Sequence, residues 1–436
     1  MKKLALHWKI LIGMMVGLVL GILATNLGFE SFIRNWIKPF GDIFLNLLKL
    51  IAVPLIIGSL IKGVTDLKDI SRLSSMGLKT FGIYLVTTAI AVSVGLLAVN
   101  LSKPGHLIKE ENRESLRASY EQEARARISD AEKQREYSPL QPLVDMVPDN
   151  VFAATSSNSR MLQVIFFVIF FGIGLILIPE DKSRPVIAFF EGINTVVMKM
   201  VDLIMLAAPF GVMALLANLI VASPSKDIFV ALLGYMLTVV AGLVFMIFIF
   251  YPLVVKFFTG KSPFFFLKNF APAQLVAFST SSSAATLPVT MERVNEHLGV
   301  HEDVSSFVFP IGATINMDGT ALYQAVAAVF IAQAYGMDLS VGAQLGIILT
   351  ATLASIGTAA VPGAGVLMLI IVMSQAGIPE AGVALILAVD RPLDMLRTVA
   401  NVTSDATCAM IVAKSEGKLG DPIAENWNDI YKQQGR

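Results

Sequence analysis

The last quarter of this 436-residue chain carries charged and amide side chains at helical spacing. At 3.6 residues per turn they fall within an arc of about 80°, and they are Asp390, Asp394, Arg397, Asn401 and Asp405. The opposite side of the same helix is mostly apolar and includes Leu396 and Val399. A helix with such a polar stripe requires a polar cavity inside the protein.

Arg397 and Asp394 lie one turn apart and predict the charge pattern of a ligand. The planar guanidinium of Arg397 suits a carboxylate in a way that lysine does not reproduce. Asp394 can hold an ammonium group, so the two side chains together predict an acidic amino acid as the ligand. The alternative is an internal salt bridge that fixes helix packing, and this stretch alone leaves both interpretations open.

The same region offers hard oxygen ligands of the type that an alkali cation requires. The side chains concerned are Asn316, Asp318, Asn401 and Asp405. Backbone carbonyls of unwound segments near Gly312, Met317 and Ser355 can add further oxygen atoms. Helices interrupted in this way are typical of ion sites in transporters.

The composition places the chain in the membrane-protein class. Hydrophobic residues make up 55% of the sequence and charged residues only 15%, whereas soluble proteins have about 25% charged residues. Lipid accommodates this excess of apolar side chains. The formal net charge is zero, which gives no sign of a nucleic-acid partner, and the single Cys408 excludes an intrachain disulfide.

A helix needs about 20 predominantly apolar residues to cross the hydrocarbon core. Clear candidates run near 8–27, 37–63, 77–101, 161–179, 196–222 and 227–258. Lysine and arginine gather at the N-terminus and in every second connection, which places both termini in the cytoplasm. The charged segment 103–144 then lies outside as a solvated loop or short surface helix. We expect a multi-pass protein of the cell inner (plasma) membrane.

Beyond residue 260 the apolar segments are interrupted by serine, glycine and proline. Unpaired backbone groups at membrane depth are tolerated only inside protein or beside a watery cavity. Short arms joined by a polar tip predict two re-entrant hairpins, at 262–297 and 339–376. A long helix with an asparagine and an aspartate follows each hairpin, so the unit occurs twice. Interrupted segments in corresponding halves indicate a transporter binding site, and we expect inverted repeats.

Three strings in this region resemble the dicarboxylate/amino acid:cation symporter family. That family includes the glutamate (excitatory amino acid) transporters and archaeal aspartate transporters. The strings are 280–288, 316–320 and 394–398, the last together with Asn401 and Asp405. The similarity is dense over 262–414 and looser over the earlier helices, and three motifs in the same order argue against chance.

The resemblance implies an all-α polytopic membrane protein with eight transmembrane helices, two re-entrant helical hairpins and inverted repeats. It also implies a homotrimer whose transport domain moves like an elevator against a scaffold, with the second hairpin as the gate. The implied divisions are scaffold helices 1 and 2 at 1–76, helix 3 of the transport domain at 77–102, the external loop at 103–144, scaffold helices 4 and 5 at 145–222, the rest of the transport domain at 223–414 and a cytoplasmic tail at 415–436.

Site residues follow from the same resemblance. Those implied for the substrate are Ser282, Ser283, Thr320, the tip from Val361 to Gly365, Asp394, Arg397, Thr398 and Asn401. One implied sodium site comprises Gly312, Asn316, Asn401 and Asp405, and a second comprises Thr314, Met317, Ser355, Ile356 and Thr358. A third comprises Tyr84, Thr87 and Thr88 with Asn316 and Asp318. The first three of these share one helical face, as a common ligand requires.

The sequence departs from the family pattern in places that matter. Ser281 stands where archaeal members carry an arginine at the first hairpin tip, and Arg391 on the last helix can supply that charge. Gln324 stands where potassium-coupled animal transporters have a glutamate, so potassium counter-transport is not expected. Relatives that carry C4-dicarboxylates lack the acidic residues found here as Asp394 and Asp405.

The expected function is symport of L-aspartate or L-glutamate with more than one sodium ion, without enzymatic activity. The sequence contains no phosphate-binding loop for ATP-driven transport. The serines at 279–283 have no histidine base nearby, which disfavours a hydrolase. Three alternatives stay open here: coupling to protons, a neutral amino acid as the substrate, and an amino-acid-gated anion channel.

Overall fold

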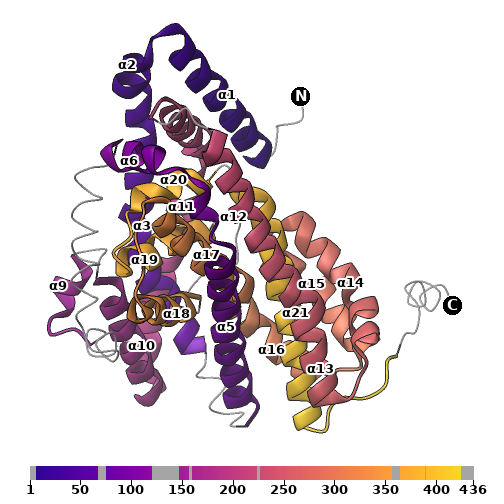
Figure 1. Cartoon of the computed structure of the whole chain (residues 1–436). Helices are drawn as coiled ribbons and strands as arrows, with labels where there is room; N and C mark the ends of the chain where they lie inside the picture. The colour runs from indigo at the N-terminus through magenta and orange to yellow at the C-terminus, as the bar shows by residue number, and fades with distance from the viewer. Residues whose placement is uncertain are drawn as a thin grey trace, which may run out of the picture.

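The computed structural model describes residues 6–66, 75–119, 147–156, 160–222, 226–355, 364–387 and 389–423. Throughout these ranges the chain folds into helices (Figure 1). Within them, β-type pairing is limited to one isolated bridge, between Val300 and Leu419. The predicted helical fold class is therefore confirmed for the described residues.

One group of helices comes from the N-terminal half of the chain. Its long members are α1 (Leu6–Leu27), α3 (Lys38–Asp66), α10 (Met161–Leu177) and α11 (Glu180–Ala222). Three short helices, α2 (Glu30–Phe32), η1 (Ile33–Ile37) and α9 (Val151–Thr155), connect or precede them. Helix α11 packs along both α1 and α3, and α10 packs against α3. In Figure 1, α1 projects at the end of the molecule far from α14 and α15.

Helix α11 begins at Glu180, earlier than the expected start at 196. These first turns were not predicted, because their charged residues lower the hydropathy of the stretch. Glu180 and Asp181 nevertheless favour a helix there, because negative side chains interact well with the N-terminal end of the helix dipole. The helix bends by 51° between Glu180–Val201 and Leu206–Asn218. Pro209 lies inside the second part, and internal prolines are an established cause of helix bending.

A second group surrounds the C-terminal helix α21 (Asp390–Ser415). It contains α5 (Ser75–Ser102) and a continuous rod formed by α12 (Lys226–Phe245), η4 (Met246–Phe250) and α13 (Tyr251–Thr259). Helices α13, α14, α16 and α17 all pack against α21, and α17 also packs along α5. Every residue of α17 (Asp318–Ala334) is buried, so this helix forms the centre of the group.

Two pairs of short helices belong to the second group. The first pair is α14 (Pro263–Thr280) and α15 (Ser283–Glu292), which continues as η5 (Arg293–His297); the second is α18 (Val341–Ser355) and α19 (Ala364–Gln375). The two arms of each pair contact each other. The first pair, hereafter hairpin 1, is followed by α16 (Glu302–Ile315) and α17. The second pair, hereafter hairpin 2, is followed by η6 (Glu380–Gly382), α20 (Val383–Ile386) and α21.

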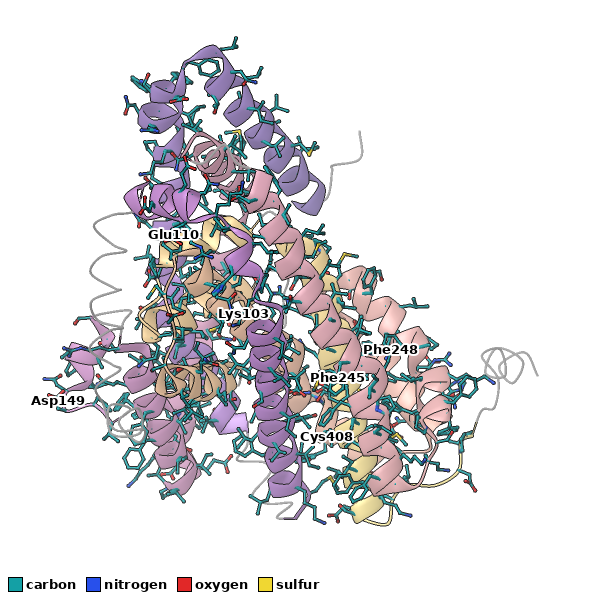
Figure 2. The ribbon with its side chains drawn as sticks, in the orientation of Figure 1. Lys103, Glu110, Asp149, Phe245, Phe248 and Cys408 are labelled. Carbon is teal, nitrogen blue, oxygen red and sulfur yellow. The ribbon has the colours of Figure 1, made fainter. Side chains whose placement is uncertain are left out.

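Four helices in the described ranges are long and apolar enough to cross a membrane, or five if the bent α11 counts as one span. The four are Glu30–Lys62, Met76–Leu107, Asp227–Thr259 and Glu302–Ala334. The outward surface of the α12–η4 rod is apolar, with Phe245 and Phe248 exposed along it (Figure 2). These features fit a helical membrane protein, and the count of eight spans stays a prediction. The described part of the charged connection holds η2 (Pro104–Leu107) and α6 (Glu110–Ser119).

The contact between α1 and α11 depends on glycines spaced four residues apart. A Cβ atom at Gly17 would collide with the backbone carbonyl of Met213, and one at Gly13 would collide with that of Pro209. The absence of side chains at these positions lets the two helices approach closely, as small residues do in membrane helix pairs.

The Gly17→Ala variant is expected to unfold at a lower temperature than the parent protein in detergent. Overpacking of a tight contact costs about 1–3 kcal/mol. Gly192→Ala is the matched control, because it lies in α11 and a Cβ there would meet nothing within 4 Å. The control should be neutral or slightly stabilised, since alanine favours helix over glycine. Equal unfolding temperatures for the two variants would contradict the close contact.

Candidate functional site

The guanidinium of Arg397 is the most deeply buried cationic group on α21, with its side chain 1% exposed. Its Nη2 atom donates to Asp394 Oδ1 at 2.6 Å, and its Nη1 atom lies 3.2 Å from Asp390 Oδ1. The ring of Tyr323 on α17 lies 3.8 Å from the guanidinium carbon and supplies a cation–π contact. The Nε donor of Arg397 has no hydrogen-bond acceptor within the described ranges.

Asp394 is shared between two arginines. Besides its bond to Arg397, its Oδ2 atom accepts from Arg391 Nη1 at 3.2 Å. The internal salt bridge that the sequence left open is therefore present. It does not use all the donors of the guanidinium, so a structural pairing and a ligand site are compatible at this position.

Residues from three helices, α17, α19 and α21, meet at this guanidinium. A Cβ atom placed on Gly365 of α19 would lie 3.0 Å from Arg397 Nη1 and 3.1 Å from Thr320 Cγ2 of α17. The carbonyl of Gly365 accepts from Gln324 Nε2 at 3.3 Å. The predicted substrate residues Gly365, Thr320 and Arg397 thus lie together, and Thr398 adjoins them with its hydroxyl bonded to the Asp394 carbonyl at 3.0 Å.

The predicted serines of hairpin 1 lie at its tip. Ser281 adopts a left-handed conformation with φ 51°, which turns the chain between the two arms. Ser282 caps α15, where its hydroxyl accepts from the Ala285 amide at 3.2 Å, and Ser283 is buried. The hairpin contacts α21 through Gln274 Nε2, which donates to the Thr403 hydroxyl at 3.0 Å.

A first cluster of oxygen atoms forms where α16 ends beside α21. Asn316 Nδ2 donates to Asp405 Oδ1 at 2.7 Å and approaches the Asn401 carbonyl at 3.5 Å. A Cβ atom on Gly312 would collide with the Asp405 carboxylate and the Tyr84 hydroxyl, so these groups crowd together. The structure therefore brings together the four residues predicted for one sodium site.

A second cluster centres on Asp318, which is fully buried at the start of α17. Its Oδ1 atom accepts from the Thr88 hydroxyl at 2.5 Å. Its Oδ2 atom accepts from the Tyr251 and Ser404 hydroxyls at 2.8 and 2.7 Å. Of the predicted α5 residues, Thr88 reaches Asp318 directly. Tyr84 lies at the first cluster instead, with its hydroxyl donating to the Val308 carbonyl at 3.3 Å.

The backbone between α16 and α17 is unwound at Asn316 and Met317. In a continuous helix the Gly319 amide would donate to the Ile315 carbonyl. Here it donates to Asn401 Oδ1 at 2.8 Å. The Nδ2 atom of Asn401 in turn lies 3.2 Å from Met317 Sδ. The side chain of Asn401 thus holds the break open and leaves carbonyl oxygens of α16 for another partner.

Part of the second predicted sodium site and of the substrate site lies outside the described residues. Ile356, Thr358 and Val361 belong to this undescribed segment, and the side chain of Thr314 is also outside the description. Ser355, at the end of α18, is buried and bonds to the Thr352 carbonyl at 2.7 Å. Thr87 is buried on α5, where it bonds to the Tyr84 carbonyl at 3.2 Å.

The electrostatics of the two clusters favour a cation. Hydrogen bonds to Asp318 and Asp405 come from neutral hydroxyl and amide donors in the described part of the chain. Burying a carboxylate without an opposite charge costs several kcal/mol per ion. Asn316 Oδ1 is also buried and has no hydrogen-bond donor among the described residues. Within the described ranges, no group of three or more His, Cys, Asp or Glu side chains is placed to hold a metal ion.

Four residues of these clusters were absent from the predicted site. They are Asp390, Tyr323, Tyr251 and Ser404. Asp390 was detectable, because it lies on the same helical arc as Arg397. The tyrosines reach the site from α13 and α17, and no spacing in the sequence brings these helices beside α21.

The buried polar sites, the interrupted helices and the apolar exterior define a helical membrane transporter. The model of the sodium:dicarboxylate symporter family matches residues 6–415. The proton/sodium-glutamate symport protein of Geobacillus stearothermophilus is 35% identical over 97% of both chains. The proton/glutamate-aspartate symporter of Escherichia coli (strain K12) is 33% identical over 96% of this chain and 94% of its own. Human excitatory amino acid transporter 3 is 35% identical over 92% of this chain and 84% of its own.

The chain therefore belongs to the sodium:dicarboxylate symporter family. Members of this family are transporters, and the chain is not an enzyme.

The Asp405→Asn variant is expected to lose most of the thermal stabilisation that sodium chloride gives relative to choline chloride. Asparagine keeps the shape and the bond to Asn316 but removes the charge that attracts the cation. A ligand at 100 times its Kd stabilises a protein by about 2.7 kcal/mol, which a thermal shift readily detects. Asp42→Asn serves as the control, because Asp42 is half-exposed and pairs with Lys38 far from the site. Sodium stabilisation that survives in Asp405→Asn would contradict a cation site at this carboxylate.

Proposed function

We propose that this chain is a secondary active symporter that takes up L-aspartate or L-glutamate with sodium. The observation that carries the proposal is the buried guanidinium of Arg397, which keeps an unused Nε donor in the described structure. A buried donor without an acceptor is costly, and a ligand carboxylate would satisfy it.

The substrate class follows from the charges around this guanidinium. Asp394 adjoins Arg397 and can receive the ammonium group of an amino acid, while Arg397 receives the side-chain carboxylate. Thr320, Thr398 and Gly365 border the same space, and we assign the tip from Val361 onward and Ser282 and Ser283 to it by family resemblance. The named relatives are glutamate or glutamate-aspartate symporters, which supports an acidic substrate.

Sodium is the proposed coupling ion, and more than one ion is expected. The clusters around Asp405 and Asp318 each hold a buried carboxylate. Their neutral donors and the carbonyls freed at the α16–α17 break suit a hard alkali cation. We assign the second predicted sodium site, with Thr314, Met317, Ser355, Ile356 and Thr358, on resemblance.

The two helix groups support an elevator-type movement. The contacts between the groups are formed by α19 and α16 against α3, by α18 and α19 against α10, and by α20 against α11. We propose that α5 and the helices from α12 to α21 move as the transport domain, while α1, α3, α10 and α11 form the scaffold. The proposal includes eight transmembrane spans with inverted repeats, assembled as a homotrimer. The protein lies in the inner (plasma) membrane of the cell, with both termini in the cytoplasm.

Proton coupling is the second candidate, because some relatives carry protons by name. A neutral substrate would leave Arg397 without a partner for its free donor. An amino-acid-gated anion channel would need no concentrative transport at all. These alternatives differ in what drives accumulation, so a single uptake assay separates them.

Purified protein in liposomes is expected to accumulate labelled L-aspartate only when sodium is higher outside. Uptake that persists in choline medium with a proton gradient would contradict sodium coupling. No accumulation under either gradient would favour a channel.

Arg397→Ala should reduce aspartate uptake by about 100-fold or more, since losing a charged hydrogen bond to a buried ligand costs about 3 kcal/mol. Arg184→Ala is the matched control, because Arg184 is exposed on α11. The uptake of this control should equal that of the parent. A neutral amino acid transported equally by the parent and by Arg397→Ala would contradict the proposed substrate class.

A further inference from the structure

The residues that follow α21 pack back onto the structure. Segment 416–423, hereafter the C-terminal clasp, turns back toward hairpin 1. Gly417 follows the helix with φ 69°, and the Lys418 amide donates to the Ala413 carbonyl at 2.8 Å. This is the glycine-based helix ending in which the chain reverses direction. Figure 1 shows the yellow segment leaving the lower end of α21 on the side of α14 and α15.

The C-terminal clasp runs beside the connection between hairpin 1 and α16. The His301 amide donates to the Lys418 carbonyl at 3.1 Å, and the Gly420 amide donates to the Gly299 carbonyl at 2.8 Å. The Ile423 amide extends the contact by donating to the Glu296 carbonyl at 2.8 Å. The clasp is thus held by three backbone hydrogen bonds across a large sequence separation.

The absence of a side chain at Gly299 makes this approach possible. Gly299 has φ 79°, a conformation that other residues rarely adopt. A Cβ atom on Gly299 would also collide with the backbone of Gly420. The two segments are therefore too close at this point for a side chain at residue 299.

Three ion pairs lie along the clasp. The pairs are Glu416 with Lys79 at 2.7 Å, Lys418 with Asp303 at 3.1 Å, and Asp421 with Lys261 at 3.3 Å. Each exposed pair contributes little by itself. Their positions are informative, because Lys261 precedes α14 while the 296–303 region follows α15. The clasp therefore touches the chain at both ends of hairpin 1.

We propose that the C-terminal clasp locks the two ends of hairpin 1 to α21 and keeps the hairpin from separating from this helix. A helical hairpin can swing only about its ends, and here both ends are bound to one segment that continues from α21. The tip of the hairpin then keeps a fixed position relative to the polar stripe of α21. Releasing the clasp lets the hairpin separate from α21 and exposes the buried face of α14.

A cysteine introduced at Ala277 reports this separation, because Ala277 on α14 is fully buried. The native Cys408 is also fully buried and provides the background for labelling (Figure 2). With N-ethylmaleimide, modification of Ala277→Cys in the full-length protein should be slow. Adding Gly299→Ala should raise its rate by about tenfold or more, since labelling follows the population of the open form. Adding Gly28→Ala should leave the rate unchanged.

Gly28 is the matched control because its φ is 75° and a Cβ there would meet nothing within 4 Å. It carries the same backbone strain without touching the clasp. Equal labelling rates for the Gly299→Ala and Gly28→Ala proteins would overturn the proposal.

A second test does not depend on the glycines. Lys418→Glu places two negative charges together and should accelerate labelling of Ala277→Cys, and adding Asp303→Lys should restore the slow rate by reversing the pair. A rate in Lys418→Glu equal to that of the parent, or no recovery in the double variant, would also overturn the proposal. The labelling needs neither substrate nor a sodium gradient, so this proposal and the proposed transport activity fail independently.

Discussion

The fold of this protein depends on burying the charged side chains of α21 among helices that are otherwise mostly apolar. Arg397 is satisfied in part by Asp390 and Asp394 on its own helix and by the face of Tyr323. These contacts require α17 to lie directly against α21. That requirement explains why Gly319 has no side chain, since a Cβ there would collide with the Arg397 carbonyl. The central position of α17 and its complete burial follow from the same contact.

The break between α16 and α17 connects this enclosure to the cation clusters. Asn401 lies one turn beyond Arg397 and uses both of its side-chain polar atoms on the break, at Gly319 and Met317. Asn316 at the same break donates to Asp405, and Asp318, which directly follows the break, accepts from Thr88. A movement of α17 relative to α21 would therefore disturb the guanidinium and both carboxylates together. This shared support gives a physical basis for coupling a ligand to a cation.

Much of this was predictable from spacing alone. Helical periodicity placed Asp394, Arg397, Asn401 and Asp405 on one face, and the structure brings their side chains to one buried region. Interrupted apolar segments marked the places where the backbone leaves helical geometry, at Ser281 and at Asn316. Contacts between helices were not predictable from spacing, because the register of α13 against α21 is set by packing, and those of α16 with α21 and of α5 with α17 were expected only from the family resemblance. Tyr251 was therefore missed at Asp318, and the early start of α11 was missed because a hydropathy window excludes charged turns.

Gly365 shows how the site could discriminate by steric means. The charges around Arg397 would be unchanged if residue 365 were alanine, yet the added methyl group would lie against the Nη1 atom. Tyr323 already covers one face of the guanidinium, so little free volume is left beside it. The proposed recognition at this arginine therefore depends on the space that Gly365 leaves as much as on charge. One added methyl group could therefore narrow the range of accepted ligands without altering the electrostatics, so a single substitution would change the ligand preference.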